Sequence, residues 1–466
     1  MTKPNVSHTP KTTANAAAVA AQERLVGLCN ALSAGTLSRR DQLAKFAAYV
    51  KGLVEDGKKS MEQVGWRTLG AQWQGIQNFI SDNAWDCGPV WDEITERLAA
   101  AIEPDCIVID EVTDPKNGDD SVGVTHQRCG HTAKVDNCQM AVTSHLSGKK
   151  GSGVVGSHLC MPKKWVNDAA RRAKAHVPTA LVYETQVQLA TRLVDRLRAA
   201  GLGHLVVLAD SLYGCNCDFR MRLEKHTQPF VLEIKSNMLV RAANSHLQPL
   251  PPRAKGNRRA SDWAYAQSPV GVRTFARQHK AKFKNVSWAN PDVTTPGAGK
   301  HTSRFAAFQI KPAMGKYEKA YTQQGKDTPA NTLLIEWPRS TKDAVKYWLS
   351  NMPPETSLER LVELAKRRYR VEQDYRELKG EIGLDKFQGR LYHGFAHHAV
   401  CCAAAMLFLT LERTSGHWRR AWRGYVGPRC SYSIATIRRF VHNALATLGP
   451  PGSRAGPAQH SVHAAA

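Results

Sequence analysis

The chain has 466 residues, with 64 Lys and Arg against 40 Asp and Glu, a formal net charge of +24 and a pI of about 9.7. That length allows two or three domains around a large core, and a surface this basic attracts polyanions such as nucleic acid. No segment approaches the roughly 20 uninterrupted apolar residues of a transmembrane helix, and the start lacks the apolar core of a signal peptide, so we expect a cytoplasmic, nucleoid-associated protein with no membrane partner.

Pattern and composition predict an α/β protein flanked by appendages. Eleven scattered cysteines without CxxC spacing predict free, mostly buried thiols. The predicted segments are 1–20, a disordered tail; 21–102, an N-terminal helical domain that is a candidate for DNA binding; 103–240, the first part of the α/β core; 241–330, a basic insertion subdomain; 331–447, the final strand and helices of the core; and 448–466, a second disordered tail.

The N-terminal segment shows helical periodicity without a strand pattern. A break near Gly70, followed by a helix with Trp73, Gln74, Gln77 and Asn78, resembles a helix-turn-helix in outline. Any helical hairpin with a central glycine would show the same pattern, so both interpretations stay open.

The next segment predicts strands that end in acids. CIVIDEV, SVGVTHQRCG and KVDNCQMAVTSHLSG are predicted as successive antiparallel strands, and a helix then leads into LVVLADSLYG. Asp110 and Asp210 end apolar, β-branched runs, so each carboxylate is expected at the edge of a buried sheet, where active-site groups tend to lie.

Residues 241–330 interrupt this succession of strands and helices with Pro, Gly and basic clusters. This pattern predicts either an inserted β subdomain or a long basic loop region. The clearest cluster for phosphate contact is Arg253, Lys255, Arg258 and Arg259. Trp263, Trp288 and Trp337 are candidates for stacking on an unpaired base, and core packing is the alternative for each.

A long charged helix is predicted over SLERLVELAKRRYRVEQDYRELKG. Arg368, Glu372, Arg376 and Lys379 fall at helical spacing along one stripe, so a carboxylate that suits a metal is flanked by cations that suit phosphate. A solvated face of ion pairs is the alternative. The neighbouring apolar stripe, predicted to dock on a sheet, is Val371, Tyr375 and Leu378.

Three of these segments resemble one known family. DEVTDPKNGDDSVGVTHQRCGHTAKVDNCQMAV is similar to the first-aspartate region of DDE transposases from bacterial insertion sequences, of the insertion sequence 701 family, which is related to the insertion sequence 4 superfamily. LADSLYG is similar to their Val-Ala-Asp-x-x-Tyr-Gly stretch, and RYRVEQDYRELKGEIGLDKFQGR to their helix with the final glutamate. The resemblance runs from about residue 103 to 413 and implies an RNase H-like catalytic core.

The resemblance also implies roles for residues at matching positions. Asp110, Asp210 and Glu372 would be catalytic and would hold two Mg²⁺ or Mn²⁺ ions, while Arg368 and Lys379 would contact transposon-end phosphates. The implied activity is DNA strand cleavage at the element's ends, followed by strand transfer to target DNA. The implied assembly is a homodimer on paired ends.

Three positions depart from the family pattern. Glu111 and Val112 follow the first aspartate where the family has Asp and Thr, and Ala365 replaces a Tyr. A slipped alignment would make Glu111 the ligand, but successive strand residues face opposite sides, and we prefer Asp110. Two alternative functions stay open: a decayed transposase that acts as a DNA-binding regulator, and a metal-dependent nuclease that cuts without joining.

Overall fold

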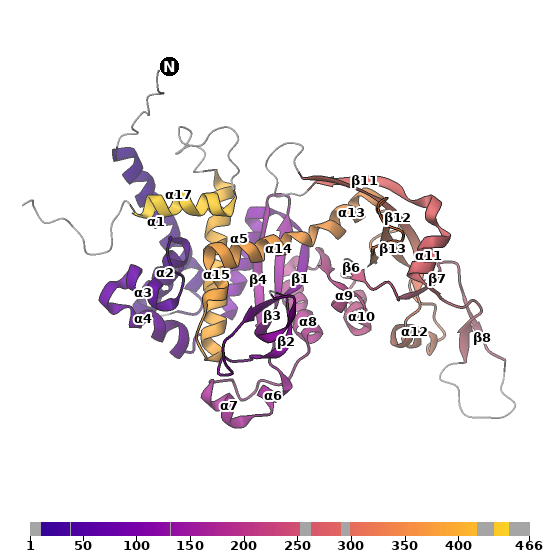
Figure 1. Cartoon of the computed structure of the whole chain (residues 1–466), viewed down its shortest axis with the longest axis horizontal. Coiled ribbons are helices and arrows are strands. Elements are labelled where there is room, and N and C mark those ends of the chain that lie inside the picture. The colour runs from indigo at the N-terminus through magenta and orange to yellow at the C-terminus, as the bar shows by residue number, and fades with distance from the viewer. Residues whose placement is uncertain are drawn as a thin grey trace, which may run out of the picture.

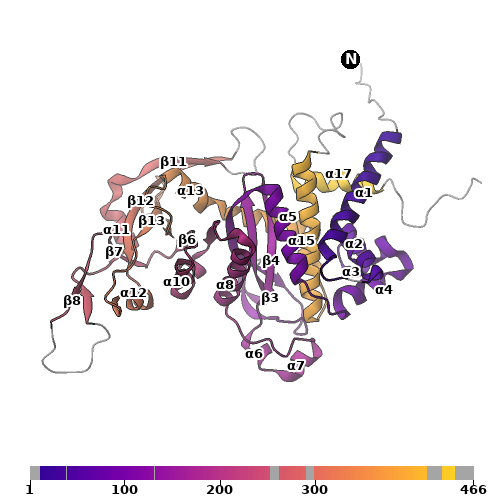
Figure 2. The same cartoon turned by 180° about the vertical axis from the view of Figure 1, so that it is seen from behind.

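The computed structural model describes residues 11–37, 39–130, 132–251, 262–289, 299–416 and 433–446. Most helices of the two terminal parts gather at one end of an elongated molecule (Figure 1). Strands β1, β3 and β4 lie in the middle, and a second group of strands forms the opposite end, which the view from behind also shows (Figure 2). The described chain is a mixed α/β structure.

The N-terminal part is helical through Ile102. Residues 11–20 belong to the first helix, so the predicted tail is wrong there, because the alanine-rich run has high helix propensity. The break at Gly70 is present and has a positive φ of 57°. The elements are α1 (Lys11–Ser33), α2 (Arg40–Val54), α3 (Met61–Leu69), η1 (Gly70–Gln72), α4 (Gln74–Gln77), η2 (Asn78–Asp82) and α5 (Gly88–Ile102).

The central strands run in the order β4-β3-β1-β5-β6, with β3 antiparallel to β1 and β4, and β1, β5 and β6 mutually parallel. The sequence missed β4, because its Gly and Ser hide the apolar alternation. Both β2 and β4 pair with β3, so the predicted strand succession was wrong: β3 lies between β1 and β2. The strands are β1 (Pro104–Pro115), β2 (Thr125–Cys129), β3 (Lys134–Gly148), β4 (Gly151–Leu159), β5 (Val206–Ala209) and β6 (Phe230–Ile234).

Helices join these strands. The helix before β5 begins at a capping box, in which the Thr185 hydroxyl and the Gln188 side chain each bond the other residue's backbone N–H. The helices are α6 (Lys163–Val166), α7 (Ala169–Lys174), α8 (Gln186–Leu197), η3 (Arg198–Leu202), α9 (Ser211–Gly214) and α10 (Cys217–Lys225).

The insertion continues the central sheet. From β6 the strands follow as β14-β13-β12-β7-β10, with β11 also on β12, so residues 241–330 form strands as the first alternative predicts. Arg253, Lys255, Arg258 and Arg259 lie outside the described residues. The elements are β7 (Leu239–Ala242), β8 (Leu247–Pro249), β9 (Trp263–Tyr265), β10 (Val270–Gly271), α11 (Val272–Gln278), η4 (Lys280–Lys282), β11 (Lys284–Ala289), β12 (Lys300–Pro312), α12 (Gly315–Thr322), β13 (Asn331–Glu336) and β14 (Lys346–Ser350).

The predicted charged helix consists of α13 (Leu358–Arg367) and α14 (Tyr369–Glu377), with Arg368 between them. It crosses the molecule from the insertion to the central strands (Figure 1). Next along the chain, α15 (Tyr392–Ser415) is long and apolar enough to cross a membrane, yet 83% of its most apolar window is buried within the protein. The remaining elements are η5 (Leu378–Ile382), η6 (Leu384–Lys386) and α17 (Ile434–Ala446).

The two predicted tails differ in outcome. The second one, residues 448–466, lies outside the described residues. None of the ten cysteines in the described part of the chain is in a disulfide, and six of them are buried, as predicted.

Gly214, in the LADSLYG motif, packs closely against the backbone of β6. A Cβ added there would lie 1.9 Å from the backbone oxygen of Glu233. We expect Gly214→Ala to lower the free energy of unfolding by about 2–3 kcal/mol, because the sheet backbone must shift. Gly315→Ala, where nothing lies within 4 Å, should change it by less than about 0.5 kcal/mol in the same urea titrations. Equal effects would contradict this packing.

Candidate active site

Asp110 and Asp210 lie side by side on two parallel strands. Asp210 directly follows β5, as predicted, whereas β1 continues beyond Asp110 to Pro115, so the predicted strand-end position of Asp110 is wrong. The preceding residues, Ile109 and Ala209, are paired in the sheet. Along both strands the even-numbered residues pack beneath α13 and the start of α14, so both aspartates continue on that face. Asp210 also caps α9, since its Oδ1 accepts the backbone N–H of Leu212 at 2.8 Å.

The guanidinium of Arg368 lies among the acids. Its Nη1 is 2.9 Å from Asp110 Oδ2, and its Nη2 is 4.0 Å from Glu372 Oε1. Burial by itself lowers the pKa of Arg368, yet nearby carboxylates outweigh it, and the pKa is raised above its ordinary value. Those carboxylates are Asp110, Glu233, Asp210 and Glu372. One cation therefore lies within electrostatic reach of all three predicted acids.

Burial and mutual repulsion raise the pKa values of the two adjacent acids of β1, Asp110 and Glu111. The pKa of Asp110 is raised, mainly by burial and further by Asp210, although Arg368 opposes the shift. Burial raises the pKa of Glu111 to about 7, with Asp210 and Asp110 adding to it. The Tyr213 hydroxyl donates to Glu111 Oε1 at 2.7 Å and opposes that shift. The negative charge here is thus only partly compensated.

Glu372 is not part of a closed ligand cluster. Its side chain is 50% exposed, and Arg368 lies between it and Asp110. In the described ranges, no group of three or more His, Cys, Asp or Glu side chains is placed to hold a metal, so the predicted convergence of three carboxylates is not formed. The donor chemistry of Asp110 and Asp210 nevertheless fits a hard divalent cation, because both offer carboxylate oxygens in a region with excess negative charge.

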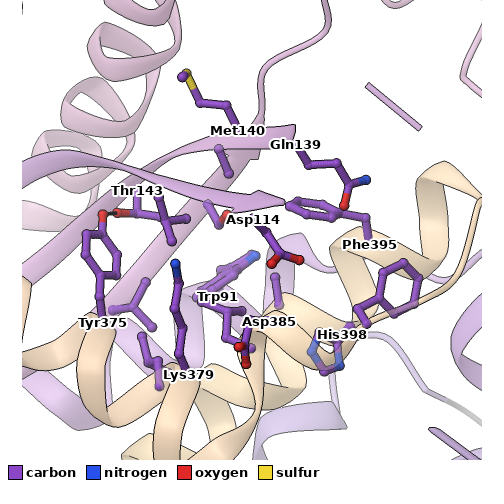
Figure 3. Close-up of a pocket in the computed structure, with 18 residues that line it drawn as sticks. Trp91, Asp114, Gln139, Met140, Thr143, Tyr375, Lys379, Asp385, Phe395 and His398 are labelled. Atoms are coloured by element: carbon purple, nitrogen blue, oxygen red, sulfur yellow. Dashed lines mark hydrogen bonds between the residues drawn. The ribbon is translucent and has the colours of Figure 1, made fainter. Parts of the chain in front are cut away.

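The three predicted cations of this helix point in different directions. Arg368 faces the acids, whereas Arg376 is exposed and its Nη1 donates to Gln373 Oε1 at 2.9 Å. The ammonium of Lys379 donates to the carbonyl of Thr113 at 2.8 Å. Lys379 lines a small cavity of about 40 Å³ beside Asp114 and Asp385, rather than the groove at Glu372 (Figure 3). Of the three, only Arg368 contacts the acids.

A groove of about 970 Å³ opens beside Glu372 and runs along α13 to the insertion. Its lining holds seven Lys and Arg against four Glu, so it carries excess positive charge. Trp288 lines it, with the Lys366 ammonium 4.6 Å from its ring centroid and His301 stacked at 5.6 Å. Trp337 is 2% exposed and belongs to the core, and Trp263 is absent from the groove lining.

Sequence patterns missed two groups near the acids. Tyr213 is buried and bonds Glu111; it is the Tyr of the Val-Ala-Asp-x-x-Tyr-Gly resemblance, which gave it no role. Glu233 lines the groove with its carboxylate 3.7 Å from Lys346. The single acid inside the apolar run FVLEI is the one signal that could have identified it.

Comparison with known proteins assigns the family. The model of the family described as DDE superfamily endonuclease matches residues 33–292, more than half of the chain, and the protein belongs to this family. The matched range includes Asp110 and Asp210 and ends before Glu372. This bears out the resemblance stated above, and divalent metal use is what the family implies.

Individual relatives are distant. The chain is 26% identical over 170 residues to a probable transposase for insertion sequence element IS701 from Microchaete diplosiphon, and the match covers 36% of this chain and 42% of that one. It therefore spans less than half of that relative. The cryo-EM structure of a piggyBac transposase synaptic complex with hairpin DNA aligns over 93% of this chain and 80% of its own, with 12% identity and a TM-score of 0.38.

The raised pKa of Glu111 predicts a pH dependence in EDTA. Below about pH 4.5 the carboxyl is protonated in both folded and unfolded chains; between 4.5 and 7 the unfolded chain loses its proton first, so stability falls as pH rises. Glu111→Gln keeps an acceptor for Tyr213 and removes this loss. From pH 4 to pH 8, the variant's free energy of unfolding should gain on the wild type by on the order of 2 kcal/mol. A pH-independent difference in urea titrations would contradict the prediction.

Proposed function

We propose that the protein is a DDE transposase that binds the ends of its element, cleaves DNA strands with the help of a divalent metal, and transfers the freed 3′ end to target DNA. The observation that carries this proposal is the placement of Asp110 and Asp210 on one sheet face, with Arg368 between them and Glu372. Membership of the endonuclease family supports the same reaction class.

The strand order supports an RNase H-like core as its scaffold. Three antiparallel strands, β4, β3 and β1, are followed by the parallel strands β5 and β6, with α8 and α10 as the connecting helices. We propose that the strands beyond β6 are the inserted subdomain of such a core. In this arrangement the chain needs no separate hinge to bring the insertion beside the acids.

The metal would be Mg²⁺ or Mn²⁺, two ions in all, and would act as a Lewis acid at the attacking and leaving oxygens. Asp110 and Asp210 would supply ligands from the sheet, and Glu372 would supply the third carboxylate from α14. Arg368 would exchange Asp110 for a DNA phosphate, because a guanidinium bonds carboxylate and phosphate with the same fork geometry. The chain's own groups thereby neutralise and orient the scissile phosphate.

We propose that the groove along α13 binds the DNA strand that leads to the acids. Its exposed cations, including Lys149 and Lys346, would follow the backbone, and Trp288 would stack on an unpaired base. Arg376 and Lys379, and the cluster at 253–259, remain proposed phosphate contacts. A homodimer on paired ends, acting in the cytoplasm on the nucleoid, completes the proposal.

The decisive experiment uses labelled DNA fragments copied from the sequences that flank the protein's own gene, incubated with Mg²⁺ and a supercoiled target plasmid. We expect cleavage at one position and joined products for the wild type. Asp210→Asn should lower the cleavage rate by at least ~10³-fold, because it removes an anionic ligand. DNA binding measured by mobility shift should stay within about threefold.

The other outcomes separate the alternatives. Metal-dependent cleavage without joined products would favour a nuclease. Binding without cleavage by the wild type would favour a decayed regulator, with Val112 and Ala365 as the first positions to restore. Cleavage that survives Asp210→Asn under metal would overturn the proposed site.

Trp288 gives a second test. Trp288→Ala should weaken binding of an oligonucleotide with an unpaired end by roughly 5- to 100-fold, the cost of losing one stacked base. Trp263→Ala removes a tryptophan that is 38% exposed but outside the groove, and should leave the affinity unchanged. Fluorescence anisotropy at fixed salt measures both. Equal losses would contradict the stacking role in the groove.

A further inference from the structure

The sheet face beneath α14 is polar although it is buried. Thr143, His145 and Ser152 are 3%, 0% and 0% exposed, and α14 places Asp374 and Arg370 against them, at 0% and 5%. Burying five polar side chains between a helix and a sheet is costly unless each finds a partner, so such contacts tolerate very few arrangements. The position of this helix is therefore defined by hydrogen bonds as well as by apolar packing.

Asp374 is the centre of these bonds. His145 Nδ1 lies 2.9 Å from its Oδ2, and the Ser152 hydroxyl donates to its Oδ1. Arg370 Nε donates to Ser152 Oγ at 2.6 Å and is 3.5 Å from Asp374 Oδ1. Asp374 thus has one carboxylate oxygen facing the imidazole and the other facing Ser152 and Arg370. Both strands β3 and β4 thus hold one carboxylate of α14.

A second anchor lies one residue further along the helix. His145 Nε2 is 3.1 Å from Thr143 Oγ1, and the Tyr375 hydroxyl is 2.5 Å from the same oxygen. Thr143 Oγ1 therefore joins His145 of β3 to Tyr375 of α14. Thr143 pairs with Asp110 in the β1–β3 register, and its Oγ1 lies 3.4 Å from the Asp110 carbonyl oxygen. This chain of hydrogen bonds therefore links α14 to the residue of β3 that lies opposite Asp110.

We propose that Asp374 is a positioning residue: through His145 and Ser152 it fixes the rotation and distance of α14, and thereby where Glu372 stands relative to Asp110. Asp374 follows Glu372 by two residues, which at ~100° per residue places it on the far side of the helix. A rotation that freed Asp374 would therefore also change the position of Glu372 relative to the aspartates. The inference deepens the proposed function and rests on it for the role of Glu372.

Two features make this more than ordinary packing. The Asp374 carboxylate is hydrogen-bonded to side chains on two different strands. These bonds fix both the distance of α14 from the sheet and its rotation about its own axis. Arg413, buried nearby, has its pKa lowered to about 10, first by burial and next by Arg370, against the attraction of Glu377 and Asp374. Replacing Asp374 by a neutral group would leave the charges of Arg370 and Arg413 less compensated, so we expect α14 to shift.

The test compares Asp374→Asn, which keeps the shape and removes the charge, with Tyr375→Phe, which removes only the second anchor. Val64→Ala, fully buried in the N-terminal helices far from α14, serves as a control for lost stability. Each variant is assayed well below its melting temperature. The measurements are Mn²⁺ affinity by electron paramagnetic resonance without DNA, the kcat and KM for cleavage of the flanking fragment, and amide exchange along α14.

We expect Asp374→Asn to weaken Mn²⁺ binding by roughly 10- to 100-fold, as loss of a residue that orients a ligand typically does. Its kcat should fall by about 100-fold with KM within threefold, since a displacement near 1 Å costs that much. Tyr375→Phe should show a smaller change in the same direction, with faster exchange in α14. Val64→Ala should change neither Mn²⁺ affinity nor kcat.

Unchanged Mn²⁺ affinity and kcat in Asp374→Asn, or equal losses in Val64→Ala, would overturn the inference. Failure of the proposed function looks different: the wild type would bind Mn²⁺ but would not cleave the DNA. In that case the metal affinities of the three variants still decide whether Asp374 positions Glu372.

Discussion

The pairing of Arg368 with Asp110 is the interaction on which the arrangement of this site depends. Parallel pairing of β1 with β5 brings two carboxylates together at one edge, and burial raises the pKa of Asp110 further. Their repulsion is offset by a guanidinium from the junction of α13 and α14, at 2.9 Å. Removing one partner of such a part-buried pair costs about 3–5 kcal/mol when the other charge stays buried. The sheet and the crossing helix are thereby bound to each other at the site itself.

The two sides of α14 are held by different kinds of interaction. One side presents Arg368 and the half-exposed Glu372 to the acids and the groove, while the other side buries Asp374 against β3 and β4. A phosphate or a cation can replace the charged partners of Arg368 and Glu372, whereas solvent cannot replace the buried hydrogen bonds of Asp374. A change of charge at the acids would therefore move the side chains of Arg368 and Glu372 and leave the helix axis in place.

The sequence predicted the parts of the site that local patterns encode. Apolar runs identified β1 and β5 and the acids that follow those runs, although β1 itself continues beyond Asp110 to Pro115. Helical spacing identified the stripe of Val371 and Leu378, which are buried. Local patterns do not encode long-range pairing, so the position of β3 between β1 and β2 and the strand β4 were missed. Nor do they encode side-chain direction: Lys379 sits on the predicted stripe, yet it reaches back to Thr113. Whether Asp110, Asp210 and Glu372 carry catalysis stays a prediction.

The insertion is joined to the acids by continuous sheet hydrogen bonds rather than by a flexible linker. Strand β14 pairs with β6, which pairs with β5, so Trp348 lies opposite Glu233, two strands from Ala209 and Asp210. Lys366 of α13 then joins Trp348 to Trp288 on β11, since its ammonium lies 5.5 and 4.6 Å from the two rings. The sheet fixes the distance from groove to acids, because sliding one strand by a residue would turn its side chains to the other face. The register of the strands would thus set the distance between Asp210 and a substrate held at Trp288.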